Sequence, residues 1–162
     1  MNHNRGYTIL ELLIYTALLA LLLAVSSASA ISLYRFFGVT RIERQIALEG
    51  DTAMEIIIRD IRNATSTNVA SSVFGLHPGA LVVGDVRLFL SGATLRRSVG
   101  AGAADDLTAQ TRATNFLVYY ATSTSFSNNA EIITVRVTLE AGRGFAERSR
   151  NFFGSAVVRG SY

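Results

Sequence analysis

The chain of 162 residues has no cysteine, no lysine, one proline and only two histidines. Without cysteine there is no disulfide, no zinc–thiolate site and no thiol nucleophile. His3 and His77 are too few for a histidine metal cluster or a histidine-based catalytic triad. The sequence therefore predicts a protein that is not an enzyme and that binds no metal and no cofactor. The single proline, Pro78, permits a long uninterrupted helix elsewhere in the chain.

Charge is also scarce, because charged residues make up 17% of the chain and apolar residues 49%. The 15 arginines exceed the 12 acidic residues by three, and this small excess is not the clustered basic surface of a nucleic-acid-binding protein. One group near the C-terminus combines arginine with aromatic residues, as some single-strand DNA sites do: Arg143, Arg148 and Arg150. Acidic residues at Glu140 and Glu147 dilute it, so the pattern favours surface arginines over DNA binding. The phenylalanines beside it are expected to fill the core: Phe145, Phe152 and Phe153.

What the sequence does contain is a long apolar run near the N-terminus. The 23 residues from Leu12 to Tyr34 carry no charge, and about 20 residues of helix suffice to cross a bilayer. A simple signal anchor is one interpretation of this run. A secretory signal peptide is another, with Arg5 as its basic start and a small-residue cut after Ala30, at the end of Ala28-Ser29-Ala30.

A third interpretation starts from Glu11, which stands at the head of the apolar run, where a carboxylate is unfavourable. Cleavage between Gly6 and Tyr7 would free an α-amine at Tyr7, four residues before Glu11 along the helix. An amine and a carboxylate attract each other strongly in a low-dielectric interior, whereas either charge alone is disfavoured there. Between staggered neighbouring helices such a pair would fix register. Only this interpretation gives Glu11 a function.

The N-terminus, Arg5-Gly6-Tyr7-Thr8-Ile9-Leu10-Glu11, resembles the class III signal of type IV prepilins and type II secretion pseudopilins. The resemblance implies cleavage after Gly6 by a prepilin peptidase, N-methylation of Tyr7 by the same enzyme, and a role for Glu11 in entry into a filament. Many major pilins have a proline where this chain has Ala28, a difference that favours a minor pilin or minor pseudopilin.

The same resemblance implies the partners and location of the chain. It would be a structural subunit of a type IV pilus-like filament or a type II secretion pseudopilus, together with other pilin or pseudopilin subunits. Its further partners would be the prepilin peptidase and the platform protein of the assembly machinery. The chain would first cross the cytoplasmic membrane once, with its head outside the cytoplasm, and would then enter a filament.

Beyond the apolar run the chain becomes amphipathic. Apolar residues recur at helical spacing from Ile42 to Ala64, and charged residues occupy the other positions. This pattern predicts one helix from Tyr7 to about Ala64, with Gly38 and Gly50 as its weakest points. The opposite face is expected to be polar and to carry Arg41, Glu43, Arg44, Glu49, Asp51, Glu55, Arg59 and Arg62.

The remainder of the sequence is typical of β structure. We expect strands at Ala80 to Val83, Asp85 to Leu90, Ala93 to Val99, Asn115 to Thr122, Glu131 to Glu140 and Asn151 to Arg159. The segments 100–106 and 123–130 are expected to be a mobile loop and a hairpin loop. The predicted fold is α+β, with an antiparallel sheet covering the apolar stripe of the helix. The predicted domains are a leader at 1–6, a transmembrane and filament-core half-helix at 7–34, an amphipathic half-helix at 35–65 and a β-rich head at 66–162.

Overall fold

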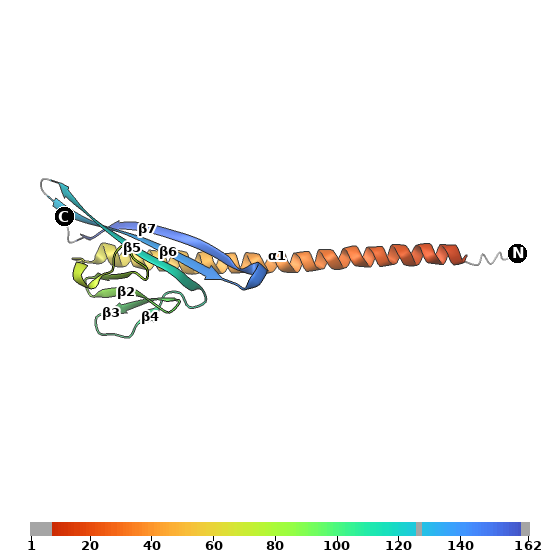
Figure 1. Cartoon of the computed structure of the whole chain (residues 1–162), viewed down its shortest axis with the longest axis horizontal. Helices are drawn as coiled ribbons and strands as arrows, with labels where there is room; N and C mark the ends of the chain where they lie inside the picture. Colours follow the sequence, from red (N-terminus) through yellow and green to blue (C-terminus); the bar gives the residue numbers. More distant parts are fainter. Residues whose placement is uncertain (1–7, 126–127, 160–162) are drawn as a thin grey trace. The chain divides into compact units, whose positions relative to one another are not determined.

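The structure, a computed structural model, describes residues 8–125 and 128–159. The chain divides into two compact units, Met1–Val39 and Thr40–Tyr162, which we call unit one and unit two. One long helix, α1, runs through Ile9–Asn63, as the sequence predicted. An antiparallel β structure follows it, so the predicted α+β fold is confirmed (Figure 1).

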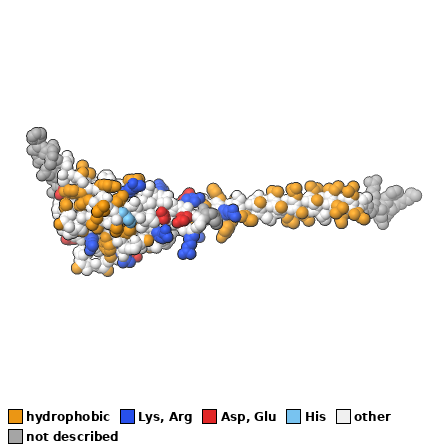
Figure 2. All heavy atoms as spheres, in the orientation of Figure 1, with side chains coloured by type: hydrophobic (Ala, Val, Ile, Leu, Met, Phe, Trp, Pro, Cys, Tyr) orange, Lys and Arg blue, Asp and Glu red, His pale blue; other side chains and the backbone are white. Residues whose placement is uncertain are grey.

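In unit one, α1 presents apolar side chains to the outside. The leucines and isoleucines from Ile9 to Leu33 are exposed, and the most apolar 18-residue window of the helix has a mean hydropathy of 2.4. Figure 2 shows these side chains along this stretch of the helix. By length and composition the helix is able to cross a membrane.

In unit two, α1 buries one stripe of side chains. Its buried apolar residues are Ile46, Ala53, Met54, Ile57 and Ile61, and Ala64 follows directly after its end. These positions repeat at three- and four-residue steps, which places them on one face. The expected amphipathic pattern is therefore confirmed, with one exception: Glu49 is half-buried and accepts hydrogen bonds from the loop at 110–111.

The β structure consists of two sheets, not the single sheet that the sequence suggested. The first has the order β1-β2-β3-β4 and contains Ala80–Val83, Val86–Ser91, Thr94–Val99 and Asp105–Asp106. The prediction of a loop throughout 100–106 is wrong at its end, because Asp105 and Asp106 pair with β3. Arg96 donates a 2.7 Å hydrogen bond from Nε to Asp106 Oδ1, which adds a side-chain link between the two strands.

The second sheet has the order β5-β6-β7 and contains Arg112–Ser125, Asn128–Ala141 and Arg148–Val157. Its strands lie alongside α1 in unit two (Figure 1). The first two are longer than predicted, and the pairing continues to Ser125 and Asn128, so the expected loop at 123–130 is mostly strand. Serine, threonine and asparagine give this stretch the composition of a loop, but its backbone pairs as two strands. Short 3₁₀ helices lie at Val69–Ser71 and Gly144–Ala146.

The core forms where both sheets meet the buried stripe of α1. Strand β6 contributes four buried residues that alternate with polar ones, as the sequence predicted. They are Ile133, Val135, Val137 and Leu139.

The phenylalanines of the C-terminal segment do not all fill this core. On β7, Phe152 is buried but Phe153 is 64% exposed, so the expectation is wrong for Phe153. Successive residues of a strand point to opposite faces, which excludes burying both on one side. The guanidinium carbon of Arg136 instead lies 5.2 Å from the centre of the Phe153 ring. The side chain of Phe145 lies outside the part of the chain that the structure describes.

Gly50 is a point of close contact between α1 and β7. It is buried, and a Cβ atom added there would overlap the ring of Phe152. Gly154 makes a similar contact on β7, where a Cβ atom would lie 2.6 Å from Met54 Cε. The helix continues through Gly50, so this glycine provides room for an aromatic ring.

We predict that Gly50→Ala lowers the free energy of unfolding by about 1–3 kcal/mol, because overpacking outweighs the helix propensity that alanine adds. Chemical denaturation of the full chain in detergent, followed by tyrosine fluorescence, measures this. Gly38→Ala is the matched control: nothing lies within 4 Å of its added Cβ, so it should leave stability unchanged or raise it by up to about 1 kcal/mol. Equal free energies of unfolding for Gly50→Ala and Gly38→Ala would contradict the close contact between Gly50 and Phe152.

A buried ion pair joins the end of α1 to the first sheet. Arg97 on β3 donates hydrogen bonds to both carboxylate oxygens of Asp60, at 2.6 and 3.0 Å. The Asp60 side chain is only 7% exposed and that of Arg97 is 23% exposed. The hydrogen bond to Asp60 raises the pKa of the Arg97 guanidinium above its ordinary value, against the opposing effect of burial. The guanidinium therefore stays charged, and removal of either side chain alone leaves the other without its partner.

We predict that Asp60→Ala lowers the free energy of unfolding by about 3 kcal/mol, because it leaves a partly buried guanidinium without its counter-charge. The double variant Asp60→Ala/Arg97→Met should be more stable than Asp60→Ala. The adjacent exposed pair offers a control, since Arg96→Ala removes a pair whose side chains are 40% and 43% exposed and should cost less than about 1 kcal/mol. If Arg96→Ala and Asp60→Ala lowered the free energy of unfolding by similar amounts, the buried pair would not be the more important of the two.

Candidate functional site

The candidate site is the N-terminal end of α1. Two of its predicted residues, Gly6 and Tyr7, lie outside the described residues, so the structure describes the site from Thr8 onward. Thr8 directly precedes the helix, which begins at Ile9. The predicted third residue, Glu11, lies in the first turn and is half-buried.

Thr8 caps the helix. Its Oγ1 accepts a hydrogen bond from the Glu11 backbone N–H at 3.2 Å, and its carbonyl accepts one from the Leu12 N–H at 3.2 Å. Threonine at the cap with glutamate three residues later is a recognised signature of a helix start. Thr8 and Glu11 have this spacing, so the start of the helix was predictable from these two residues.

The Glu11 carboxylate has a partner on the same helix. The Tyr15 hydroxyl donates a hydrogen bond of 3.2 Å to Glu11 Oε1, one turn further along. A carboxylate in the first turn is also favoured by the positive end of the helix dipole. These two effects give Glu11 local stabilisation that sequence reasoning missed. The i,i+4 spacing of Glu11 and Tyr15 was the available signal.

Three hydroxyl groups within the apolar stretch form hydrogen bonds with the helix itself. Thr16, Ser27 and Ser29 donate to backbone carbonyls three or four residues earlier, at 2.8 to 3.0 Å. Such bonds remove the need for water at these groups, which is what a hydrocarbon environment requires. Ser29, part of the rival small-residue cut site, lies in the helix and bonds to the Val25 carbonyl at 2.9 Å.

The comparisons with known proteins concern this same end of the chain. Residues 1–27 match the family described as the prokaryotic N-terminal methylation motif. The chain carries a type IV pilin-like class III signal. This signal implies, in general terms, processing by a prepilin peptidase and assembly with pilin subunits, and together with the apolar helix it fits anchoring in the inner membrane. It is a structural pilin motif and not an enzyme family. No curated protein and no solved structure matches the chain significantly.

The second candidate group, Arg143, Arg148 and Arg150, is only partly brought together. Arg148 and Arg150 lie two residues apart on β7 and line a cavity of about 220 Å³ with Glu43, Ile46 and Ser149, whereas Arg143 does not line it. Arg148 Nε lies 3.5 Å from Glu43 Oε1, and the Arg150 guanidinium carbon lies 5.1 Å from the centre of the Phe152 ring. Both arginines thus face groups of this chain.

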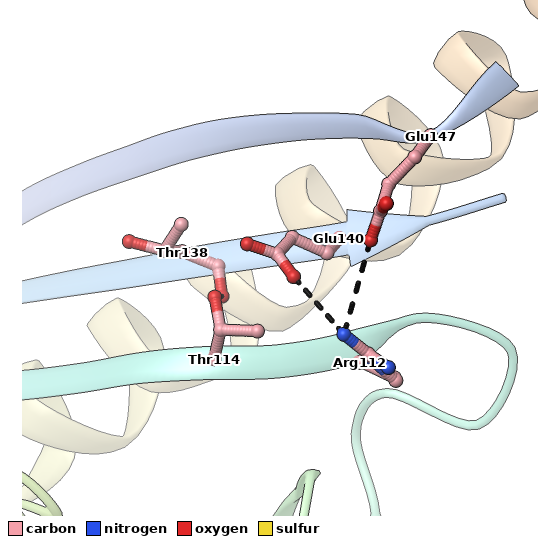
Figure 3. A network of polar contacts seen from close by, with 5 residues as sticks. All are labelled: Arg112, Thr114, Thr138, Glu140 and Glu147. Atoms are coloured by element: carbon pink, nitrogen blue, oxygen red, sulfur yellow. Dashed lines mark hydrogen bonds and ion pairs between the residues drawn. The ribbon is translucent and has the colours of Figure 1, made fainter. Parts of the chain in front are cut away.

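The acidic residues that flank this group in the sequence, Glu140 and Glu147, pair with another arginine. Glu140 and Glu147 point toward the guanidinium of Arg112, with N–O distances of 3.2 and 4.0 Å (Figure 3). Thr114 and Thr138 lie beside them, and Thr114 Oγ1 donates to the Thr138 carbonyl at 3.5 Å. The charge here is mixed, unlike the clustered basic surface that binds nucleic acid.

The remaining histidine has a structural contact. His77 Nδ1 accepts a hydrogen bond from the Phe116 backbone N–H at 3.3 Å, which links the loop at 74–79 to β5. Within residues 8–125 and 128–159, no three His, Cys, Asp or Glu side chains converge as a metal site would require.

Proposed function

We propose that the chain is a structural subunit of a type IV pilus-like or type II secretion pseudopilus filament, cut after Gly6 and then N-methylated at Tyr7. The observation that carries this proposal is the methylation motif at residues 1–27, followed by a helix whose apolar side chains are exposed. The absence of proline at position 28 favours a minor subunit, in either kind of filament.

The geometry of the helix start suits cleavage at this position. Removing residues 1–6 leaves Thr8 in place, so the hydrogen bond from the Glu11 N–H to its side chain survives. The new α-amine, at Tyr7, would directly precede Thr8 in the chain and would lie four residues before Glu11. Tyr15 donates a hydrogen bond to one carboxylate oxygen of Glu11. We infer that Glu11 pairs with the amine of a neighbouring subunit and so sets the axial register.

The exposed apolar stretch of α1 supplies the driving force for assembly. A contiguous apolar surface of this kind must be covered, first by lipid in the cytoplasmic membrane and later by the helices of other subunits. In this proposal the head lies outside the cytoplasm, and the platform protein of the assembly machinery lifts the subunit from the membrane into the filament.

A second candidate function remains from the sequence: a secreted or membrane-anchored binding protein whose signal peptide is cut after Ala30. That cut would divide α1 and leave a mature chain that begins at Ile31. It would also discard Glu11 and the capped helix start, so it gives no role to either.

We predict that mass spectrometry of the mature chain, purified from membranes that contain a prepilin peptidase, will show an N-methylated Tyr7 as the first residue. A strain without the peptidase should retain the precursor that begins at Met1, which provides the control. A mature chain that begins at Ile31 would overturn the proposal in favour of the second candidate.

We further predict that Glu11→Ala leaves cleavage after Gly6 intact but prevents entry into filaments, because the amine at Tyr7 loses its partner. Tyr15→Phe, which removes only the hydroxyl, should enter filaments with reduced efficiency. Both are measured by comparing the subunit in sheared filaments with that in membranes. Normal filament entry of Glu11→Ala would refute the pairing of Glu11 with the amine, while the mature N-terminus would still report on processing.

A further inference from the structure

An open cavity of about 410 Å³ lies in unit two, where α1 meets the loop at 110–111. We call it the arginine cavity, and its lining residues are Arg41, Arg44, Gln45, Leu48, Glu49 and Gln110. Both arginines are exposed, and among the ion pairs of the described residues none includes either of them. They lie three residues apart on one face of the helix, so their guanidinium groups can act on the same ligand.

The acidic residue of the arginine cavity is bound to the loop. Glu49 Oε1 accepts a hydrogen bond from the Gln110 backbone N–H at 2.9 Å, and Oε2 accepts one from the Thr111 N–H at 3.0 Å. Gln45 donates a hydrogen bond from Nε2 to the Gln110 carbonyl at 3.1 Å. These bonds hold the loop on α1 and leave the two arginines as the charged groups available to a ligand. Arginine suits phosphate and carboxylate, because its planar fork of N–H donors matches their oxygens.

The arginine cavity begins shortly after the apolar stretch of α1. The uncharged run ends at Tyr34, and the exposed rings of Phe36 and Phe37 extend its apolar surface. Exposed aromatic residues at the end of a membrane span are typical of the boundary between hydrocarbon and headgroups. Arg41 follows Phe37 by four residues, which is about 6 Å of helix and at most about 14 Å in any conformation. A headgroup layer is itself about 6 Å thick, so the chain keeps Arg41 close to that layer.

The direction of helical side chains brings both arginines closer to the same layer. In an α-helix the bond from Cα to Cβ leans toward the N-terminus, which here is toward the apolar stretch. Long arginine side chains beside a membrane span reach along the helix to place their charge among the headgroups. Arg41 and Arg44 are thus suited to contact lipid phosphates.

We propose that the arginine cavity binds the phosphate of an anionic phospholipid in the outer leaflet of the cytoplasmic membrane. This inference rests on the proposed function, because it requires the chain to cross that membrane with its head outside the cytoplasm. Arg41 and Arg44 donate the hydrogen bonds to the phosphate oxygens. The bound lipid fixes the depth of the subunit in the membrane, and it is released when the subunit leaves the membrane for the filament.

The charge of the cavity selects the kind of phospholipid. Its lining carries two positive charges and one negative charge, from Arg41, Arg44 and Glu49. A net positive site favours a headgroup of net negative charge over one whose phosphate is balanced by its own cation. Phosphatidylglycerol is therefore the appropriate probe, and phosphatidylcholine with the same acyl chains is its control.

Native mass spectrometry of the full mature chain in detergent, titrated with each lipid, measures this binding. Phosphatidylglycerol should bind at least tenfold more tightly than phosphatidylcholine. The double variant Arg41→Gln/Arg44→Gln should weaken the binding of phosphatidylglycerol by roughly tenfold or more, because each arginine beside an anionic lipid surface contributes about fivefold.

Arg59→Gln/Arg62→Gln is the matched control. It removes two exposed arginines with the same spacing, further along the same helix and outside the arginine cavity, and should leave the affinity within about twofold. Equal weakening by the two double variants would show attraction by overall charge and would overturn the proposed site. Displacement of the lipid by millimolar inorganic phosphate would show a site for a dissolved anion, and would overturn the assignment to a lipid.

Photo-crosslinking in vesicles that contain phosphatidylglycerol then locates the lipid. Because the chain has no cysteine, Leu48→Cys can carry a single benzophenone maleimide at the edge of the cavity. Irradiation should add the mass of one phosphatidylglycerol to this chain. Glu55→Cys, which is exposed and two turns further along α1, is the control and should give at least fivefold less adduct. Equal adducts at positions 48 and 55, or none at 48, would overturn the proposed site.

The mature N-terminus separates this inference from the proposed function. A chain that begins at Ile31 would lack most of the apolar stretch, so it would overturn the proposed function and the lipid site together. A chain that begins at Tyr7 but does not bind phosphatidylglycerol would overturn the lipid site alone.

Discussion

Unit two depends on the packing of one helical stripe against two sheets. Neither sheet has a separate hydrophobic core, because the buried residues of α1 and of both sheets form one cluster. The contact is close enough that the ring of Phe152 occupies the place where Gly50 lacks a side chain. Packing at this density fixes the position of the strands along the helix, because a shift of either would bring backbone or methyl groups into the ring.

Two carboxylates at the flank of this stripe complete the arrangement. Glu49 accepts hydrogen bonds from the backbone N–H groups of Gln110 and Thr111, at 2.9 and 3.0 Å, and from the Thr111 hydroxyl. Asp60 lies about three helical turns later along the same flank and binds Arg97. These polar contacts hold the first sheet, and the loop that leads from it to β5, on the helix. They add to the apolar packing that α1 makes with both sheets.

The parts of the structure that follow from local sequence patterns were predictable, and the contacts between distant residues were not. Periodicity located α1 to within a residue of its end and identified Ile46, Ile57 and Ile61 as core, because burial of one face is a local pattern. The partners of Glu49 and Asp60 are 61 and 37 residues away, and no local pattern shows which charged residue will turn inward. The division of the strands into two sheets also depends on which distant segments pair, so no local pattern shows it. The contacts at the N-terminus are local, because Thr8, Glu11 and Tyr15 are three or four residues apart at the start of one helix. Their spacing in the sequence was enough to predict these contacts.

The pair of Asp60 and Arg97 also bears on the end of α1. Asp60 lies in the last turn of α1, where a carboxylate opposes the negative end of the helix dipole and disfavours the turn by itself. Arg97 lies on β3, which pairs with β2, so the ion pair joins this turn to the first sheet. The counter-charge that offsets the unfavourable position of Asp60 thus comes from a segment 37 residues later in the chain.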